Sequence, residues 1–428
     1  MSRESIRSRV LHVTDTDPLT WEYLEDGVLV VEDGKISDLG SAGRFRQEGM
    51  NLEECDHRPG ELLIPGFIDT HVHSPQIDVI ASHGEQLLDW LDRYTFPAEQ
   101  KYADSEYARQ AAGEFLDGLL AAGTTTAMIF ATSHRGATDS LFDEAHDRRM
   151  RIIAGKVLMD QHAPAALCDS TSEGVRDSRL LIEKWHGRGR LGYAVTPRFA
   201  VSSSSAQLEA SGRLHADYPD TWVQTHLSEN HEEIAKVAEQ HPGAADYLAV
   251  YEQYGLVTDR AFFGHCLHLS DSEVDRLSAA GAVAVFCPSS NLFLGSGLFD
   301  VARMKSAGVR TGMATDVGGG TSLSMLRTLG DAYKVCQLNS YSLSGMEAFS
   351  MATLANAQAL GLDDRIGNLK PGSEADFLLL KPPPGSILAR RLLLARSIEE
   401  EIFIYVTMGD ESVISDTFVS GQSTRERA

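Results

Sequence analysis

Short apolar runs alternate with segments of helical periodicity through the middle of the chain. Eight runs have the length and content of buried strands; they cover residues 64–70, 124–130, 152–159, 192–195, 221–225, 261–264, 282–286 and 309–315. The clearest helical segment has apolar residues three and four positions apart and stops at Gly123; these residues are Ala108, Ala111, Ala112, Phe115, Leu116, Leu119 and Leu120. Strands that alternate with helices predict an α/β fold, and eight such strands predict a (β/α)8 TIM barrel.

The two ends of the chain share a β-rich pattern that differs from the middle. Near the start, Asp33-Gly34 separates two apolar runs, as in a tight hairpin. Near the other end, residues 377–380 and 402–406 form further β-rich runs. Because the ends of a compact domain often lie close together, the two terminal pieces can share a sheet. The predicted domains are a small β-sandwich domain from residues 1–64 and 371–428 and the barrel from residues 65–370.

The composition is that of an ordinary globular protein. The 428 residues suffice for one large barrel with a smaller companion domain. The 61 acidic residues exceed the 38 Lys and Arg residues, and the formal charge of −23 argues against a nucleic-acid partner. Five scattered cysteines without a Cys-x-x-Cys pair indicate neither a disulfide framework nor a thiolate metal site. We find no signal-peptide pattern and no apolar run of about 18 residues, so we expect a cytoplasmic protein without a membrane partner.

Polar residues with catalytic potential follow several predicted strands. In barrels of this kind the active site lies at the carboxyl ends of the strands. His71 and His73 end the first run, and because residues two apart on a strand face the same side, both imidazoles can reach one metal ion. The other candidates at strand ends are Arg198, Phe199, His226, Glu229, His265 and Asp316. Such agreement among several strand ends is far more specific than any single motif.

The interval between the first two strands is too long for an ordinary connection. It covers residues 73–102, whereas connections in α/β units typically have about two to six residues. We expect residues 74–101 to form a functional loop that closes over the ligand.

Taken together, these residues resemble the mononuclear metal-dependent deaminases of the amidohydrolase superfamily. The resemblance rests on His71-x-His73 after residues 65–69, on His226 with Glu229 three positions later, and on His265 and Asp316. Residues 75–76, 84–91, 95–99 and 196–200 further resemble the guanine deaminase family, and the likeness covers nearly the whole chain. Binuclear relatives place a carbamylated lysine at the end of the fourth strand. This sequence has Arg198 there, which favours a single metal ion.

The resemblance implies a hydrolase that converts guanine to xanthine and ammonia in purine catabolism, and it implies a homodimer. One Zn²⁺ per subunit is implied, although such ligands also suit iron or manganese; the implied ligands are His71, His73, His226 and Asp316. The ion would lower the pKa of a bound water toward neutrality. Asp316 would take a proton from the attacking water, Glu229 would carry one to the ring nitrogen and the departing amine, and His265 would position the nucleophile.

The resemblance also implies how the base is recognised. The amide of Gln76 offers donors and an acceptor to the lactam edge of a purine, whereas Arg198 offers donors to its carbonyl oxygen. Phe199 can stack on the ring or contact its edge. The full substrate-binding set is His73, Gln76, Arg198, Phe199, His226, Glu229 and Asp316.

Other polar motifs have simpler interpretations. The remaining histidines are better explained as packed residues, with His83 and His231 the ones that border the predicted site. Residues 187–192 match the string G-x-G-x-x-G, but they precede a strand, whereas a dinucleotide-binding loop follows one. Cys266 and Cys287 are interpreted as small buried residues.

Two other functions stay open at this point. A related amidohydrolase acting on another aminopurine, a pterin or a triazine would share every metal ligand, so only a panel of substrates can separate it. A barrel without activity that serves as a binding protein typically lacks metal ligands, and here the implied set is complete.

Overall fold

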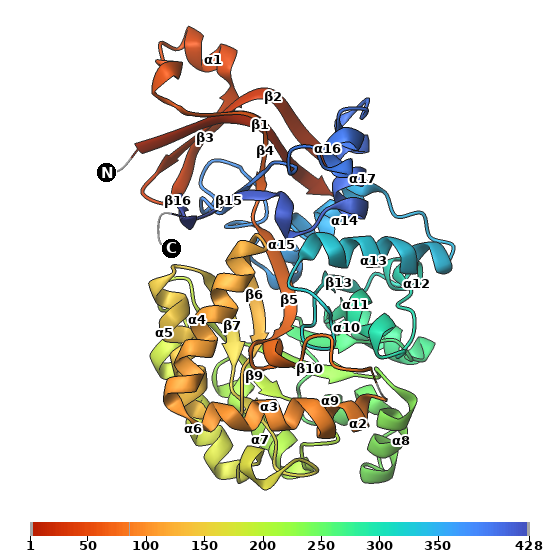
Figure 1. Cartoon of the computed structure of the whole chain (residues 1–428). Coiled ribbons are helices and arrows are strands. Elements are labelled where there is room, and N and C mark those ends of the chain that lie inside the picture. Colours follow the sequence, from red (N-terminus) through yellow and green to blue (C-terminus); the bar gives the residue numbers. More distant parts are fainter. Residues whose placement is uncertain (1–2, 85, 426–428) are drawn as a thin grey trace.

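The computed structural model describes residues 3–84 and 86–425, which form a barrel with a β domain at one end (Figure 1). Eight parallel strands follow one another around the barrel in the order β5-β6-β7-β9-β10-β11-β12-β13. Their bounds are β5 Phe67–His73, β6 Thr124–Phe130, β7 Arg151–Gly155, β9 Gly192–Pro197, β10 Trp222–Leu227, β11 Ala261–His265, β12 Val283–Phe286 and β13 Arg310–Met313. The predicted strand at 152–159 is divided into β7 and the short β8 (Val157–Leu158), which pairs with β9. The predicted barrel is thereby confirmed.

The barrel closes where its first and last strands meet. The Thr70 hydroxyl of β5 donates to the carbonyl oxygen of Met313 on β13 at 3.1 Å. Just beyond β13, the backbone N–H of Asp316 donates to the carbonyl oxygen of His71 at 3.0 Å. A Cβ on Gly312 would lie only 2.5 Å from Oγ1 of Thr70, so the close approach of the two strands requires glycine at this position.

Helices cover the outside of the barrel, and α4 (Ser105–Ala121) confirms the clearest predicted helix. Its apolar residues are buried, and the Asp104 side chain accepts hydrogen bonds from the first turn. The other helices along the barrel are α5 Arg135–Asp147, α6 Thr171–Trp185, α7 Ser205–Asp217, α8 His231–Gln240, α9 Tyr247–Gln253, α10 Asp271–Ala280, α11 Pro288–Phe293, α12 Val301–Ser306, α13 Met325–Leu338, α14 Gly345–Met351 and α15 Leu354–Leu360. None of the helices in the described ranges is both long and apolar enough to cross a bilayer.

The two ends of the chain meet in one seven-stranded sheet, as predicted. Its order is β16-β15-β14-β4-β1-β2-β3, so strands from the start and the end of the chain are neighbours. Their bounds are β1 Arg3–Thr16, β2 Leu19–Glu32, β3 Lys35–Ser41, β4 Asp56–Pro65, β14 Phe377–Leu380, β15 Ile414–Val419 and β16 Gln422–Ser423, and α1 (Ala42–Gln47) follows β3. The antiparallel pairing of β4 with β14 joins the two ends. The domain limits at 64/65 and 370/371 stay a prediction.

One terminal element was predicted wrongly. Residues 402–406 belong to the helix α17 (Ile398–Met408), which follows α16 (Ile387–Leu392), and not to a β-rich run. The Ser397 side chain accepts a hydrogen bond from the first turn, where three consecutive glutamates favour the positive end of the helix dipole. The helix packs against α13 and α14. A five-residue apolar run does not distinguish a buried helix from a strand. Ser397 and the glutamates that mark the start of the helix precede that run.

The long connection after β5 crosses the carboxyl end of the barrel as a series of short helical turns (Figure 1). They are η2 Ser74–Val79, α2 Leu87–Trp90, the π-helical turn η3 Leu91–Thr95 and α3 Phe96–Gln100. Residue 85, within the 84–91 segment used for the resemblance, lies outside the described residues. The segment therefore forms a wall over the strand ends, and its closing motion stays a prediction.

Candidate active site and metal centre

The four predicted metal ligands come together at the carboxyl end of the barrel. Nε2 of His71 lies 3.3 Å from Oδ1 of Asp316, and Nε2 of His73 lies 3.4 Å from the same oxygen. Nε2 of His226 lies 3.2 Å from Nε2 of His73. All four side chains are buried or nearly so. Ligand atoms this close, from β5, β10 and the turn after β13, form a cluster able to hold one divalent ion.

The chemistry of the cluster fits a metal ion better than a hydrogen-bond network. Nε2 of His71 is buried and makes no hydrogen bond among the described residues, although Oδ1 of Asp316 lies 3.3 Å away. Burying a polar nitrogen without a hydrogen bond is costly, so Nε2 of His71 calls for a ligand. The facing Nε2 atoms of His73 and His226 can share only one proton between them, whereas both can donate a lone pair to a cation. Three imidazoles and one carboxylate form a donor set that suits zinc.

Asp69 links the two chain segments that carry His71 and Asp316. Its carboxylate accepts hydrogen bonds from the backbone N–H groups of His71 at 3.1 Å and of Thr315 at 3.2 Å, and from the Thr315 hydroxyl. Asp69 thus ties the ends of β5 and β13 together, and burial raises its pKa to about 6. A Cβ on Gly264 would lie 2.7 Å from Cε1 of His71, so glycine on β11 leaves room for that ring.

Glu229 and His265 form an acid–base pair beside the cluster. Nε2 of His265 lies 3.2 Å from Oε2 of Glu229 and 3.8 Å from Oδ2 of Asp316. The Asn291 amide group donates to Nδ1 of His265 at 2.9 Å, which leaves the ring proton on Nε2 to face Glu229. The Ser296 hydroxyl donates to Oε1 of Glu229 at 2.9 Å. Asn291, in the short helix α11, and Ser296, in the loop after it, were not found from the sequence, because no motif marks them and their partners lie far away in the chain.

Two carboxyl groups of the site have pKa values shifted in opposite directions. Burial, together with the charges of Asp316 and Glu233, raises the pKa of Glu229 well above its usual range. Burial would also raise the pKa of Asp316, but the neighbouring imidazoles of His71, His73 and His265 hold it well below its usual range. Opposite shifts of this kind are typical of a proton donor beside a proton acceptor.

A small cavity of about 40 Å³ opens beside these groups. Gln76, Arg198 and Phe199, the predicted base-recognition residues, line it together with the predicted catalytic side chains. The sequence did not indicate the apolar part of the wall, which is made by Leu87, Trp90, Leu91 and Leu294. Neither His83 nor His231 is among the described residues that line the cavity, and the His231 ring instead packs on His268 with centroids 4.0 Å apart. The cavity combines apolar walls with a few polar groups, as ligand sites usually do.

Another buried carboxylate, Glu99 on α3, stands behind this cavity. It accepts hydrogen bonds from Nη1 of Arg198 at 2.8 and 3.0 Å and from Nε2 of Gln76 at 3.1 Å. Glu99 belongs to the 95–99 segment of the family resemblance, which implies no role for it. Its function could not be inferred because both partners lie far away in the sequence.

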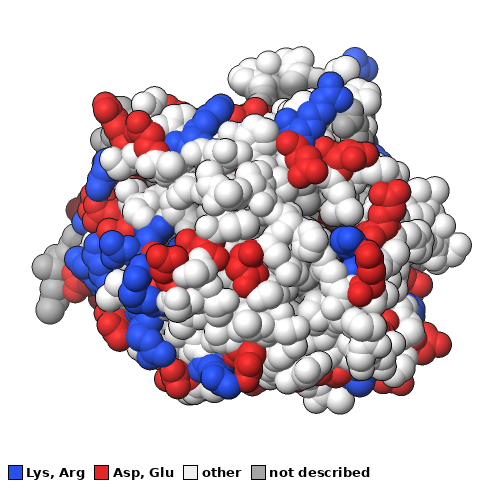
Figure 2. Space-filling view, turned by 90° about the horizontal axis from the view of Figure 1, so that it is seen from below, with Lys and Arg blue, Asp and Glu red and all other residues white. Residues whose placement is uncertain are grey.

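The face of the molecule that covers the strand ends is mostly uncharged. Figure 2, seen from the side of α2, α3 and α8, shows wide white areas, with acidic and basic side chains interspersed. No broad basic surface is visible on this face. A face of this kind offers little attraction to phosphate groups.

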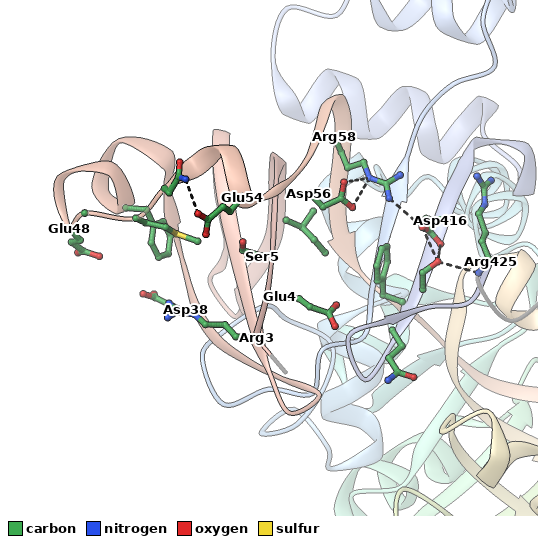
Figure 3. A pocket seen from close by; sticks show the side chains of 18 residues that line it. Arg3, Glu4, Ser5, Asp38, Glu48, Glu54, Asp56, Arg58, Asp416 and Arg425 are labelled. Carbon is green, nitrogen blue, oxygen red and sulfur yellow. Dashed lines mark hydrogen bonds and ion pairs between the residues drawn. The ribbon is translucent and has the colours of Figure 1, made fainter. Parts of the chain in front are cut away.

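A much wider hollow, about 1170 Å³, lies in the terminal β domain (Figure 3). Three of its charged side chains pair with each other: Nε of Arg58 lies 2.8 Å from Oδ2 of Asp56, and Nη2 of Arg58 lies 4.0 Å from Oδ2 of Asp416. Size alone therefore does not identify the site. The predicted metal ligands and the shifted pKa values lie at or beside the smaller cavity of the barrel.

Known proteins match both the sequence and the fold. Residues 62–424 match the amidohydrolase family, to which this chain therefore belongs. Guanine deaminase of Escherichia coli (strain K12) is 46% identical over 405 residues, which cover 95% of this chain and 92% of that protein. The solved structure of E. coli guanine deaminase has a TM-score of 0.96 and 44% identity, and covers 98% of this chain and 99% of its own. A crystal structure of guanine deaminase from C. acetobutylicum with guanine bound in the active site has a TM-score of 0.90 and 27% identity, over 99% of this chain and 100% of its own.

These matches confirm the resemblance drawn from the sequence. The likeness to guanine deaminases extends over nearly the whole chain, and the chain is a hydrolase that acts on C–N bonds. The residues assigned to the site stay predictions.

Proposed function

We propose that this protein removes the 2-amino group of guanine by hydrolysis and releases xanthine and ammonia. The observation that carries the proposal is the single cavity that joins His73, His226 and Asp316 to Glu229 and to the base-recognition residues. The relatives support the choice of substrate, since they are guanine deaminases and one of them has guanine bound in its active site.

The cluster of His71, His73, His226 and Asp316 would hold one divalent ion, for which we propose zinc. When bound there, such an ion acts as a Lewis acid and makes a water molecule nucleophilic near neutral pH. The residues around it supply the proton transfers.

The protons of the reaction can be followed through two carboxyl groups. Asp316, which stays ionised, takes a proton from the attacking water as the new C2–O bond forms. Glu229, which holds its proton because its pKa is raised, gives that proton to the ring nitrogen N3. The proton taken by Asp316 then reaches the amino group by way of Glu229, the C2–N bond breaks, and ammonia leaves. The hydroxyl group on C2 returns its proton to Glu229, so the water contributes one oxygen and two protons overall. His265, which lies beside both Glu229 and Asp316, would position the nucleophile.

The base would be held by its lactam edge. Gln76 and Arg198 line the cavity with amide and guanidinium groups that match an N–H and a carbonyl oxygen, and Phe199 contributes an aromatic ring. His73, His226, Glu229 and Asp316 complete the contacts at the reacting carbon. A free base is uncharged, which agrees with a cavity whose cationic residue, Arg198, is already paired with Glu99.

Three further features are proposed from the family resemblance alone. They are a homodimer, a cytoplasmic location and a role in purine catabolism. Analytical ultracentrifugation of the purified protein tests the first of them, and a monomer at micromolar concentration would contradict it.

The substrate is tested with purified protein that has received one equivalent of zinc. Guanine should be converted to xanthine, which is followed by the ultraviolet change and by the release of ammonia. Metal-stripped protein is the control. Absence of turnover with guanine, together with turnover of 2-aminopurine, a pterin or a triazine, would replace guanine by the other heterocycle.

A further inference from the structure

Glu99 is completely buried on α3, in the segment that crosses the mouth of the barrel. It is not among the described residues that line the cavity, whereas its two partners, Gln76 and Arg198, are. Glu99 therefore contacts the residues that face the ligand without facing the ligand itself. A buried carboxylate in this place needs a reason, because taking a charge out of water is costly unless it is paired.

The first consequence concerns Gln76, whose side-chain amide is held at both ends. Its Nε2 donates to Oε1 of Glu99 at 3.1 Å, and its Oε1 accepts from the backbone N–H of Gly318 at 3.1 Å. An ionised carboxylate can only accept and a backbone N–H can only donate, so the amide has a single orientation. Its remaining N–H and its remaining lone pair are thus fixed in direction toward a ligand.

The second consequence concerns Arg198. Both of its hydrogen bonds to Glu99 use Nη1, so the guanidinium has further N–H groups to offer to a ligand. Its central carbon also lies 5.5 Å from the centre of the Phe96 ring, on the same short helix as Glu99. The ion pair of Arg198 with Glu99 has no net charge. Arg198 therefore offers hydrogen-bond donors at fixed places in the cavity without adding a net charge to this part of its wall.

We propose that Glu99 is a positioning residue that makes this cavity selective for the lactam edge of the base. It sets the orientation of Gln76 and the placement of Arg198, and it keeps the wall uncharged. This inference rests on the proposed function, because it names the part of the substrate that these residues recognise. The preference for a 6-oxo group with a neighbouring ring N–H then depends on a carboxylate that never touches the base.

The decisive variant is Glu99→Gln, which preserves size and removes the charge. A glutamine at this position can donate as well as accept, so it no longer fixes the Nε2 end of the Gln76 amide, which is then held only by the Gly318 N–H, and it no longer offers Arg198 a full carboxylate. The probe pair is guanine and 2,6-diaminopurine, which share the 2-amino group and differ at the 6-position and at the adjacent ring nitrogen. We expect KM for guanine to rise and the ratio of kcat/KM between the two substrates to fall about 10- to 100-fold. Bound zinc should be unchanged by elemental analysis.

Glu374→Gln is the matched control. Glu374 also accepts hydrogen bonds from a buried arginine, Arg151, but at the opposite end of the barrel. This control should lower the melting temperature and leave the ratio between the two substrates unchanged. A loss of thermal stability in Glu99→Gln without a change of that ratio would show that Glu99 is only structural and would overturn the inference.

Glu99→Asp covers the case in which Glu99→Gln fails to fold. It keeps the charge but shortens the side chain by one methylene group, so it cannot reach both partners in the same way. A folded, zinc-loaded Glu99→Asp variant with reduced preference for guanine supports the inference, and one with the full preference overturns it. Failure of the proposed function is a separate result, because the unchanged protein would then not convert guanine at all.

Discussion

Charged groups are buried at both ends of the barrel strands, but they are paired differently at the two ends. At the amino end, Arg190 pairs with Asp376 and lies 2.7 Å from Glu374, and Arg151 also pairs with Glu374. These ion pairs join the barrel to the terminal β domain. At the carboxyl end, the imidazoles of His71, His73 and His226 face one another and Asp316, and the buried pair of Arg198 with Glu99 lies beside the cavity. Buried charges at the amino end thus join two domains, whereas at the carboxyl end they are arranged around a cavity that can take a ligand.

The largest effect on activity should come from removing one of the imidazoles predicted to bind the metal ion. His71→Ala removes one metal ligand, and we expect turnover of guanine to fall about 10⁴-fold or more. Bound zinc, measured by elemental analysis, should fall with it. The melting temperature should also stop responding to added zinc, because stabilisation by a ligand requires binding to the folded state. A variant that keeps stoichiometric zinc and activity would contradict the assignment of His71.

Glu229→Gln tests proton transfer apart from metal binding. Removing a positioned acid–base group typically costs about 10²- to 10⁴-fold in rate, and we expect a loss in that range. Zinc content should stay at one equivalent, since Glu229 is not among the predicted ligands. If the variant keeps activity within a few-fold of the unchanged protein, the proton must travel through another group.

Arg190→Ala tests the opposite end of the barrel. It leaves Asp376 and part of the Glu374 charge buried without their partner, which should lower the free energy of unfolding by about 3–5 kcal/mol. Urea unfolding measures this change. The kcat/KM for guanine at low temperature should stay within about two-fold, since surface and core changes far from a site act mainly on stability. A selective loss of kcat/KM in the folded variant would remove the distinction between the two ends.

The smallest effect is a pH dependence at the carboxyl end. Burial raises the pKa of Glu233 from 4.5 to about 6, so the folded protein holds this proton more tightly than the unfolded chain. The contribution of Glu233 to stability is therefore fully present below pH 4.5 and is lost as the pH rises to about 6, by about 2 kcal/mol. Between pH 4 and 7, the free energy of unfolding of the unchanged protein should fall by this amount relative to that of Glu233→Gln, which has no carboxyl group to titrate at this position. Parallel curves over that range would contradict the shifted pKa.

Much of the fold could be predicted because most barrel strands are short runs of fully buried residues. Such runs carry their own signal, and β6, for example, has the predicted bounds. The ligands could be found because a barrel places the residues that follow its strands at one end. The helix α17 was missed because its apolar core of five residues fits either element.

The residues that were missed at the site have a common physical cause. Asn291, Ser296 and Glu99 act through hydrogen bonds to partners that are 26, 67 and 99 positions away in the chain. Each lies outside the barrel strands, in a short helix or loop whose place is decided by packing. Only the folded arrangement shows that their side chains meet His265, Glu229 and Arg198.

The pairing of β4 with β14 sets an order of events during synthesis. Pro65 at the end of β4 pairs with Phe377, so the strand must wait until the intervening barrel has been made. At about 5–20 residues per second, this wait lasts roughly 15–60 s. Until then β4 presents a free edge to other chains, which is a known route to aggregation. The composite sheet thus leaves the growing chain with an unpaired strand edge for as long as the barrel is being made.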